Sequence, residues 1–214
     1  MPILFDHKTH EQQVQIAHCT EADDSWQVRL PAHLFAAADF THIQHAARQR
    51  EWLTSRVLMY EMDGCAPDFD LQKDAFGKPF LAHRNNDNTH ISLSHSGDYC
   101  AIIRAEMPCG IDIQYFTPKM ARISDRFMRT EEWADVQSVA NQDETQIDQT
   151  LHFYWSAKEA IYKAWGTKNL SAQRIHILSA THGVVRNLQD NIIKNYVLQS
   201  QKTDDFECVW AVLQ

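Results

Sequence analysis

Side chains that suit a hard metal cation occur on a short predicted strand near the middle of the sequence. The stretch P-C-G-I-D-I-Q, residues 108–114, alternates polar and apolar residues after Gly110. Because alternate residues of a strand point to the same face, we expect Asp112 and Gln114 to lie side by side. A carboxylate beside an amide oxygen matches the oxygen ligands that Mg²⁺ prefers.

A second carboxylate lies on a predicted helix at residues 152–166, H-F-Y-W-S-A-K-E-A-I-Y-K-A-W-G. The stretch is rich in helix-forming residues and contains no proline. Helical periodicity predicts a core-facing side made of Tyr154, Ala157, Ile161, Ala164 and Trp165. Glu159 and Lys163 are four residues apart and therefore neighbours on another side. From the spacing alone they are either an ion pair on a solvated face or functional groups.

Candidate anion-binding residues occur in the first half of the sequence. Lys78 lies in the turn F-G-K-P-F, and Ser94 and His95 lie where a predicted strand, 90–94, ends in a turn. A long helical pattern, about 43–62, carries three arginines on one face: Arg48, Arg50 and Arg56. These arginines suit a polyphosphate, although a solubilising helix face would have the same appearance. The S-H-S turn lacks the G-x-S-x-G pattern of a hydrolase nucleophile.

Composition excludes several classes of protein. The formal net charge of −8 disfavours a general nucleic-acid binder. Five scattered cysteines without a C-x-x-C pair argue against a disulfide framework or a zinc site. The sequence contains no apolar run long enough to span a membrane, and we identify no signal peptide. We therefore expect a cytoplasmic monomer.

The predicted elements indicate an α+β protein made of two similar lobes. A long helix followed by a β-hairpin occurs around 43–104, and a long helix followed by strands recurs around 152–213. We expect the lobes to be residues 1–106 and 107–214, packed as an intramolecular pseudo-dimer with the site in the cleft between them. The polar stretch 141–149 is expected to be a loop.

Four motifs together resemble those of the 4′-phosphopantetheinyl transferase superfamily. W-S-A-K-E-A-I-Y-K-A-W-G resembles its W-x-x-K-E-(A/S)-x-x-K-x-x-G signature, and G-I-D-I-Q resembles its G-(I/V)-D-(I/V)-E motif. F-G-K-P-F and S-L-S-H-S-G resemble its G-K-P and S-H-S motifs, in the family's order. The chain length is similar to that of the two-lobed, Sfp-like branch rather than the short trimeric holo-ACP synthases.

The resemblance implies a reaction and a role for each matching residue. Such an enzyme transfers the 4′-phosphopantetheine arm of coenzyme A to a serine of an apo acyl or peptidyl carrier protein and releases adenosine 3′,5′-bisphosphate. Asp112 and Glu159 would bind Mg²⁺, and Glu159 would also take the serine proton. Lys163 would hold a pyrophosphate oxygen, and Lys158 would contact a phosphate.

The remaining implied contacts belong to the N-terminal lobe. Lys78, Ser94 and His95 would hold the 3′-phosphate and adenine end of coenzyme A. One or more of Arg48, Arg50 and Arg56 would complete that pocket.

One residue departs from the family pattern, and one alternative function follows from it. Gln114 stands where the family usually has Glu, so we expect it to be a weak metal ligand or to be replaced by water. A chain whose metal site has lost one acid could instead be a non-catalytic coenzyme A-binding or carrier-docking relic. Because carrier proteins are acidic, we expect docking at a local basic or apolar patch. Arg122, Arg126 and Arg129 form one candidate face, although a solvated helix face would show the same spacing.

Overall fold

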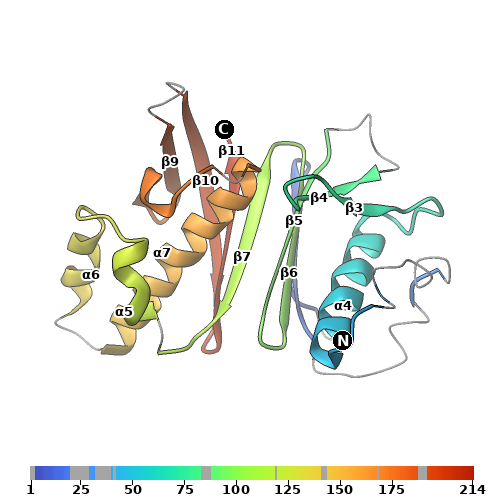
Figure 1. Cartoon of the computed structure of the whole chain (residues 1–214), viewed down its shortest axis with the longest axis horizontal. Helices are drawn as coiled ribbons and strands as arrows, with labels where there is room; N and C mark the ends of the chain where they lie inside the picture. Colours follow the sequence, from blue (N-terminus) through green and yellow to red (C-terminus); the bar gives the residue numbers. More distant parts are fainter. Residues whose placement is uncertain are drawn as a thin grey trace. The chain divides into compact units, whose positions relative to one another are not determined.

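The structure, a computed structural model, contains helices and strands in both halves of the chain (Figure 1). It describes residues 3–19, 29–31, 40, 42–82, 88–118, 120–140, 144–167, 169–187 and 192–214. Contacts divide the chain into two compact units, Met1–Glu106 and Met107–Gln214. The α+β class expected from the sequence is confirmed. Three expectations stay predictions: the function of each lobe, the packing of the lobes and the cleft between them.

The first unit is an antiparallel sheet that packs against one long helix. The strand order is β1 (Ile3–Lys8), β2 (Gln12–His18), β6 (Tyr99–Ala105) and β5 (His90–Ser96). Helix α4 (Ala46–Met62) buries Leu58 and Met59 against Ala17, Ile91 and Ile102 of the sheet. A small ribbon, β3 (Leu71–Lys73) with β4 (Pro79–Leu81), holds the turn that contains Lys78.

The second unit is a larger antiparallel sheet with helices against one of its faces. The strand order is β7 (Cys109–Tyr115), β11 (Phe206–Leu213), β10 (Ile192–Lys202), β9 (His182–Asn187) and β8 (Ile175–Ser179). Its helices are α5 (Met120–Ile123), η2 (Ser124–Arg126), α6 (Trp133–Ala140), α7 (Glu144–Trp165) and η3 (Ala172–Arg174). Helix α7 lies along β7 and β11 (Figure 1).

Helix α7 buries the face that its periodicity predicts. Tyr154, Ala157, Ile161 and Ala164 are all buried, and Trp165 packs against the same core. The expected loop at 141–149 is wrong for residues 144–149, which form the first turns of α7. These turns are polar because they are largely solvent-facing, so they show little apolar periodicity. Residues 141–143 lie outside the described part of the chain.

Three further differences concern strands. Strand β5 continues to Ser96, so Ser94 and His95 lie in the strand and the turn begins at Gly97. Strands β1 and β9 are not predicted from the sequence; both are short and lie at or near an edge of their sheets. None of the described helices has the length and apolar character needed to cross a membrane.

Candidate functional site

Gly110 brings the two motifs of the second unit together. A Cβ atom at this position would lie 2.6 Å from the backbone N of Ala164 and closer still to the carbonyl O of Ala160. Helix α7 therefore rests directly on the backbone of β7. Asp112 lies two residues further along the same face of the strand, and Glu159 and Lys163 precede the two contacting alanines.

Lys163 links the helix to the strand. Its Nζ donates to the carbonyl O of Ile111 and to Oδ1 of Asp112, each at 2.8 Å. Asp112 is only 3% exposed. A nearly buried carboxylate with an ammonium partner is a fixed charged element rather than a mobile surface pair. The site therefore has a rigid side formed by Asp112 and Lys163.

Glu159 is the second carboxylate of the site. Burial raises its pKa, the negative charge of Asp112 raises it further, and Lys163 opposes this increase. The two acids are thus close enough to repel each other, with one ammonium to offset them. A cation bound by both carboxylates would remove this repulsion.

The donor set fits Mg²⁺ better than a softer metal. Within the described ranges, no three or more His, Cys, Asp or Glu side chains converge in a way that could hold a metal. Zinc sites in proteins usually have three or four protein ligands, so two carboxylates are too few. Mg²⁺ takes one or two carboxylates and completes its coordination shell with water and substrate oxygens. Asp112 and Glu159 would be its protein ligands.

Gln114 lies beside Asp112, as strand alternation predicts. Its Nε2 donates to Oδ2 of Asp112 at 2.9 Å. In this arrangement the amide nitrogen faces the carboxylate, so its oxygen would bind a shared metal only after the amide turns over. The geometry gives Gln114 a supporting role toward Asp112, and its role as a metal ligand stays a prediction.

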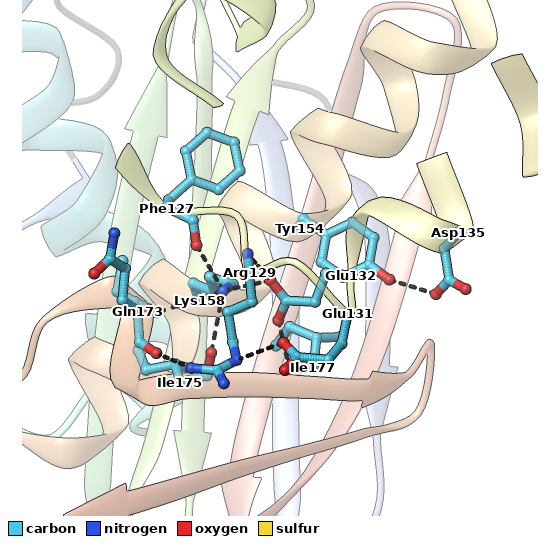
Figure 2. Close-up of polar contacts among 11 residues, drawn as sticks. Phe127, Arg129, Glu131, Glu132, Asp135, Tyr154, Lys158, Gln173, Ile175 and Ile177 are labelled. Carbon is cyan, nitrogen blue, oxygen red and sulfur yellow. Dashed lines mark hydrogen bonds and ion pairs between the residues drawn. The ribbon is translucent and has the colours of Figure 1, made fainter. Parts of the chain in front are cut away.

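Lys158, the residue before Glu159, points away from this site. It is 1% exposed, and its Nζ lies 2.7 Å from Oε2 of Glu132 (Figure 2). It also donates to the carbonyl oxygens of Phe127 and Ile175, at 2.7 and 3.1 Å. The predicted phosphate contact of Lys158 does not fit this position, because its ammonium is buried and used by the protein. Glu132 is not predicted from the sequence, because its importance depends on this contact.

In the first unit the structure brings Arg50 together with His95. Both line a small cavity of about 40 Å³ between the start of α4 and the β5–β6 turn. Glu51 lines it too, with its Oε2 3.7 Å from Nδ1 of His95, and Arg50 lies 4.0 Å from Asp98. Neither motif nor periodicity singled out Glu51.

The other two arginines of α4 are used differently. Arg48 is exposed and pairs with Glu51 at 3.0 Å, while the Arg56 guanidinium stacks on Trp52 at 3.6 Å from the ring centre. Of the three, Arg50 is the one that lines the cavity with His95.

Lys78 and Ser94 are placed differently from His95. The positive charge of Lys78 helps to lower the pKa of His90, after the larger effect of burial, so Lys78 lies near the opposite end of β5 from His95. Ser94 is buried, and strand alternation places it on the opposite face of β5 from His95. The described contacts therefore do not bring the three residues around one point.

The arginines proposed for docking are also not equivalent. Arg122 in α5 and Arg126 in η2 are exposed. Arg129 is held within the protein, where it donates to the carbonyl O of Gln173 at 2.5 Å and pairs with Glu131 at 3.4 Å. Arg122 and Arg126 therefore remain candidates for a basic docking face.

Comparison with known proteins finds similarity in the unit that contains these residues. Residues 108–211 match the family model described as the 4′-phosphopantetheinyl transferase superfamily. A 4′-phosphopantetheinyl transferase of Bacillus subtilis is 32% identical over 118 residues, which cover 55% of this chain and 49% of that protein. The transferase psf-1 of Bacillus pumilus is 34% identical over 124 residues, covering 58% and 46%. The matched region thus spans about half the length of these curated relatives.

A solved holo-(acyl-carrier-protein) synthase of Bacillus anthracis, in complex with CoA (3′,5′-ADP), aligns with 50% of this chain and 95% of its own. Its sequence identity is 20% and its TM-score is 0.36. Through residues 108–211, which include Asp112, Glu159 and Lys163, the chain is similar to the 4′-phosphopantetheinyl transferase superfamily.

Proposed function

We propose that this protein transfers the 4′-phosphopantetheine arm of coenzyme A to a serine of an apo acyl or peptidyl carrier protein in a Mg²⁺-dependent reaction. The observation that carries the proposal is the convergence of Asp112, Glu159 and Lys163, from the two motifs, at the contact between β7 and α7. The family match covers the same unit.

Asp112 and Glu159 would hold the metal ion against the pyrophosphate of coenzyme A. When bound, Mg²⁺ supplies positive charge that stabilises the attacked phosphate and the leaving group. Lys163, fixed by Asp112 and the Ile111 carbonyl, adds a second positive charge beside the same position. It is placed to attract a pyrophosphate oxygen.

Glu159 would also accept the proton of the carrier serine, directly or through a water molecule. The serine oxygen then bonds to the phosphorus that bears the pantetheine arm, while the bond from that phosphorus to the nucleotide side of the pyrophosphate breaks. The nucleotide leaves as adenosine 3′,5′-bisphosphate. The partly buried carboxylate of Glu159 suits a general base, because burial raises its proton affinity.

The nucleotide end of coenzyme A would be held by residues of the first unit. Arg50 and His95 share one cavity and are the strongest candidates for the 3′-phosphate. Lys78 and Ser94 stay proposed contacts for other parts of the nucleotide. The acidic carrier would dock near the exposed Arg122 and Arg126, which follow the metal-binding strand in sequence.

The activity is tested by incubating the protein with coenzyme A, Mg²⁺ and an apo carrier, and then weighing the carrier. We expect a mass increase of one phosphopantetheine, and none when Mg²⁺ is removed by a chelator. Glu159→Gln should reduce the rate at least about 1,000-fold, because both a metal ligand and the base are lost. Gln114→Ala is the matched control and should cost less than about tenfold.

A Glu159→Gln variant with full activity would refute the assignment of the site. Coenzyme A binding without any adduct on the carrier would favour the alternative, a non-catalytic coenzyme A-binding or carrier-docking protein. The presence of Gln114 in place of an acid is the observation that favours this alternative.

A further inference from the structure

The residue that precedes the proposed catalytic carboxylate in α7 belongs to a buried ion pair. Lys158 and Glu132 are 1% and 4% exposed, and their charged atoms are 2.7 Å apart. The Lys158 ammonium also donates to the carbonyl oxygens of Phe127 and Ile175, and lies 3.4 Å from that of Ala172. Three hydrogen-bond donors on one ammonium therefore have at least three acceptors around them.

The partner carboxylate is equally well satisfied. Oε2 of Glu132 also accepts from the backbone N–H of Arg129 at 2.9 Å, and Oε1 accepts from that of Ile177 at 3.0 Å. Arg129 in turn reaches the carbonyl O of Gln173. Figure 2 shows that these contacts join α7 to the 127–132 segment, to η3 and to β8.

These contacts oppose a rotation of α7 about its own axis. Successive residues of a helix are turned by about 100°, so Lys158 and Glu159 project roughly at right angles, and a roll of the helix turns both side chains by the same angle. A carboxylate about 5–6 Å from the axis moves by roughly 1 Å when the helix rolls by about 10°. The contacts between Gly110 and α7 are close van der Waals contacts, which have no preferred direction. The hydrogen-bonded ion pair, in contrast, constrains direction as well as distance.

We propose that Lys158 is a positioning residue, which with Glu132 fixes the roll of α7 and so places Glu159 opposite Asp112. The inference rests on the proposed function for its kinetic consequence. It replaces the phosphate contact that the sequence motif implied for Lys158. A displacement of about 1 Å at a reacting group is enough to slow a reaction about 100-fold.

The test uses the double variant Lys158→Met with Glu132→Leu. Replacing both members by apolar residues avoids leaving one buried charge alone. It still leaves the backbone N–H groups of Arg129 and Ile177 and the carbonyl oxygens around Lys158 without this side-chain partner, so we expect the thermal midpoint to fall. At a temperature where both proteins are folded, kcat should fall about 100-fold. Mn²⁺ affinity, measured by titration without carrier or coenzyme A, should weaken about tenfold, and KM for coenzyme A should change less than about twofold.

Two further variants make the result decisive. Glu132→Asp keeps the charge but shortens the reach by one methylene, so it should fold and shift kcat and Mn²⁺ affinity in the same direction by a smaller factor. Tyr154→Phe is the control on the same helix, because it removes only the hydrogen bond to Asp135 (Figure 2). It should leave Mn²⁺ affinity within about twofold of the wild type.

Unchanged kcat and Mn²⁺ affinity in the double variant and in Glu132→Asp would overturn the inference. A rise in KM for coenzyme A alone would also overturn it, in favour of a phosphate contact. Failure of the proposed function can be distinguished from failure of this inference, because the wild type itself would then modify no carrier. The Mn²⁺ titration would still report on the position of Glu159 in that case.

Discussion

Gly110→Ala is the most direct perturbation of the geometry that forms the site. The new methyl group would meet backbone atoms of Ala160 and Ala164, 2.6 Å from the backbone N of Ala164. Ordinary contact begins at 3.4 Å, so the helix would have to retreat by roughly 1 Å. Backbone atoms in the middle of a helix have no rotamer change with which to avoid the clash.

The displacement has two separable consequences. Overpacking of this kind costs about 1–3 kcal/mol of unfolding free energy. The same displacement moves Glu159 and Lys163 away from Asp112, so we expect kcat to fall about 100-fold. Urea unfolding measures the first effect, and carrier modification at a temperature where both proteins are folded measures the second.

Gly183→Ala provides a matched control. Its Cβ would meet Cδ1 of Ile161, the end of a flexible side chain that can change rotamer. We expect a loss below about 1 kcal/mol and a kcat within about threefold of the wild type. Gly110→Ala with wild-type stability and kcat, or equal damage from both substitutions, would refute the close packing of α7 on β7 as the origin of the site.

Two other predictions address a buried acid and the nucleotide pocket. Burial raises the pKa of Glu207 to about 7, from an ordinary value of 4.5, with Lys202 opposing. The folded state therefore keeps a proton that the unfolded chain releases, and stability should decline by up to about 3 kcal/mol as the pH rises from about 4.5 to about 7. Glu207→Gln should flatten this decline in urea melts at pH 5 and pH 8, and equal pH slopes in the two proteins would contradict it. In the first unit, Arg50→Ala should raise KM for coenzyme A about tenfold with kcat unchanged, because it removes a cation from the cavity, whereas the exposed Arg48→Ala should change KM less than about twofold. Steady-state kinetics checks this, and the reverse order would show that a different arginine binds the nucleotide.

Local periodicity predicted which side chains share a face. The period of two along β7 placed Asp112 beside Gln114, and they are hydrogen-bonded. The period of 3.6 along α7 separated its buried side from the side that carries Glu159. The same method missed the start of α7, because polar residues that face solvent carry little periodic signal.

Motif resemblance singled out the candidate site residues, but it did not show how each is used in the fold. Lys158 stands next to Glu159 in the signature, and its charge alone suits a phosphate. Only the folded chain shows that its ammonium lies among buried carbonyl oxygens and Glu132. A buried charge requires a partner from another element, and sequence spacing does not reveal which element will provide it.

The sequence by itself determined the α+β class, and it indicated the family resemblance and the four candidate residues Asp112, Gln114, Glu159 and Lys163. It also made Glu159 and Lys163 neighbours, because four residues are close to one helical turn. Only the tertiary structure paired Lys163 with Asp112, which lies 51 residues away in sequence. That contact depends on α7 crossing β7 at Gly110, and the packing of the two elements, rather than either pattern alone, decides it.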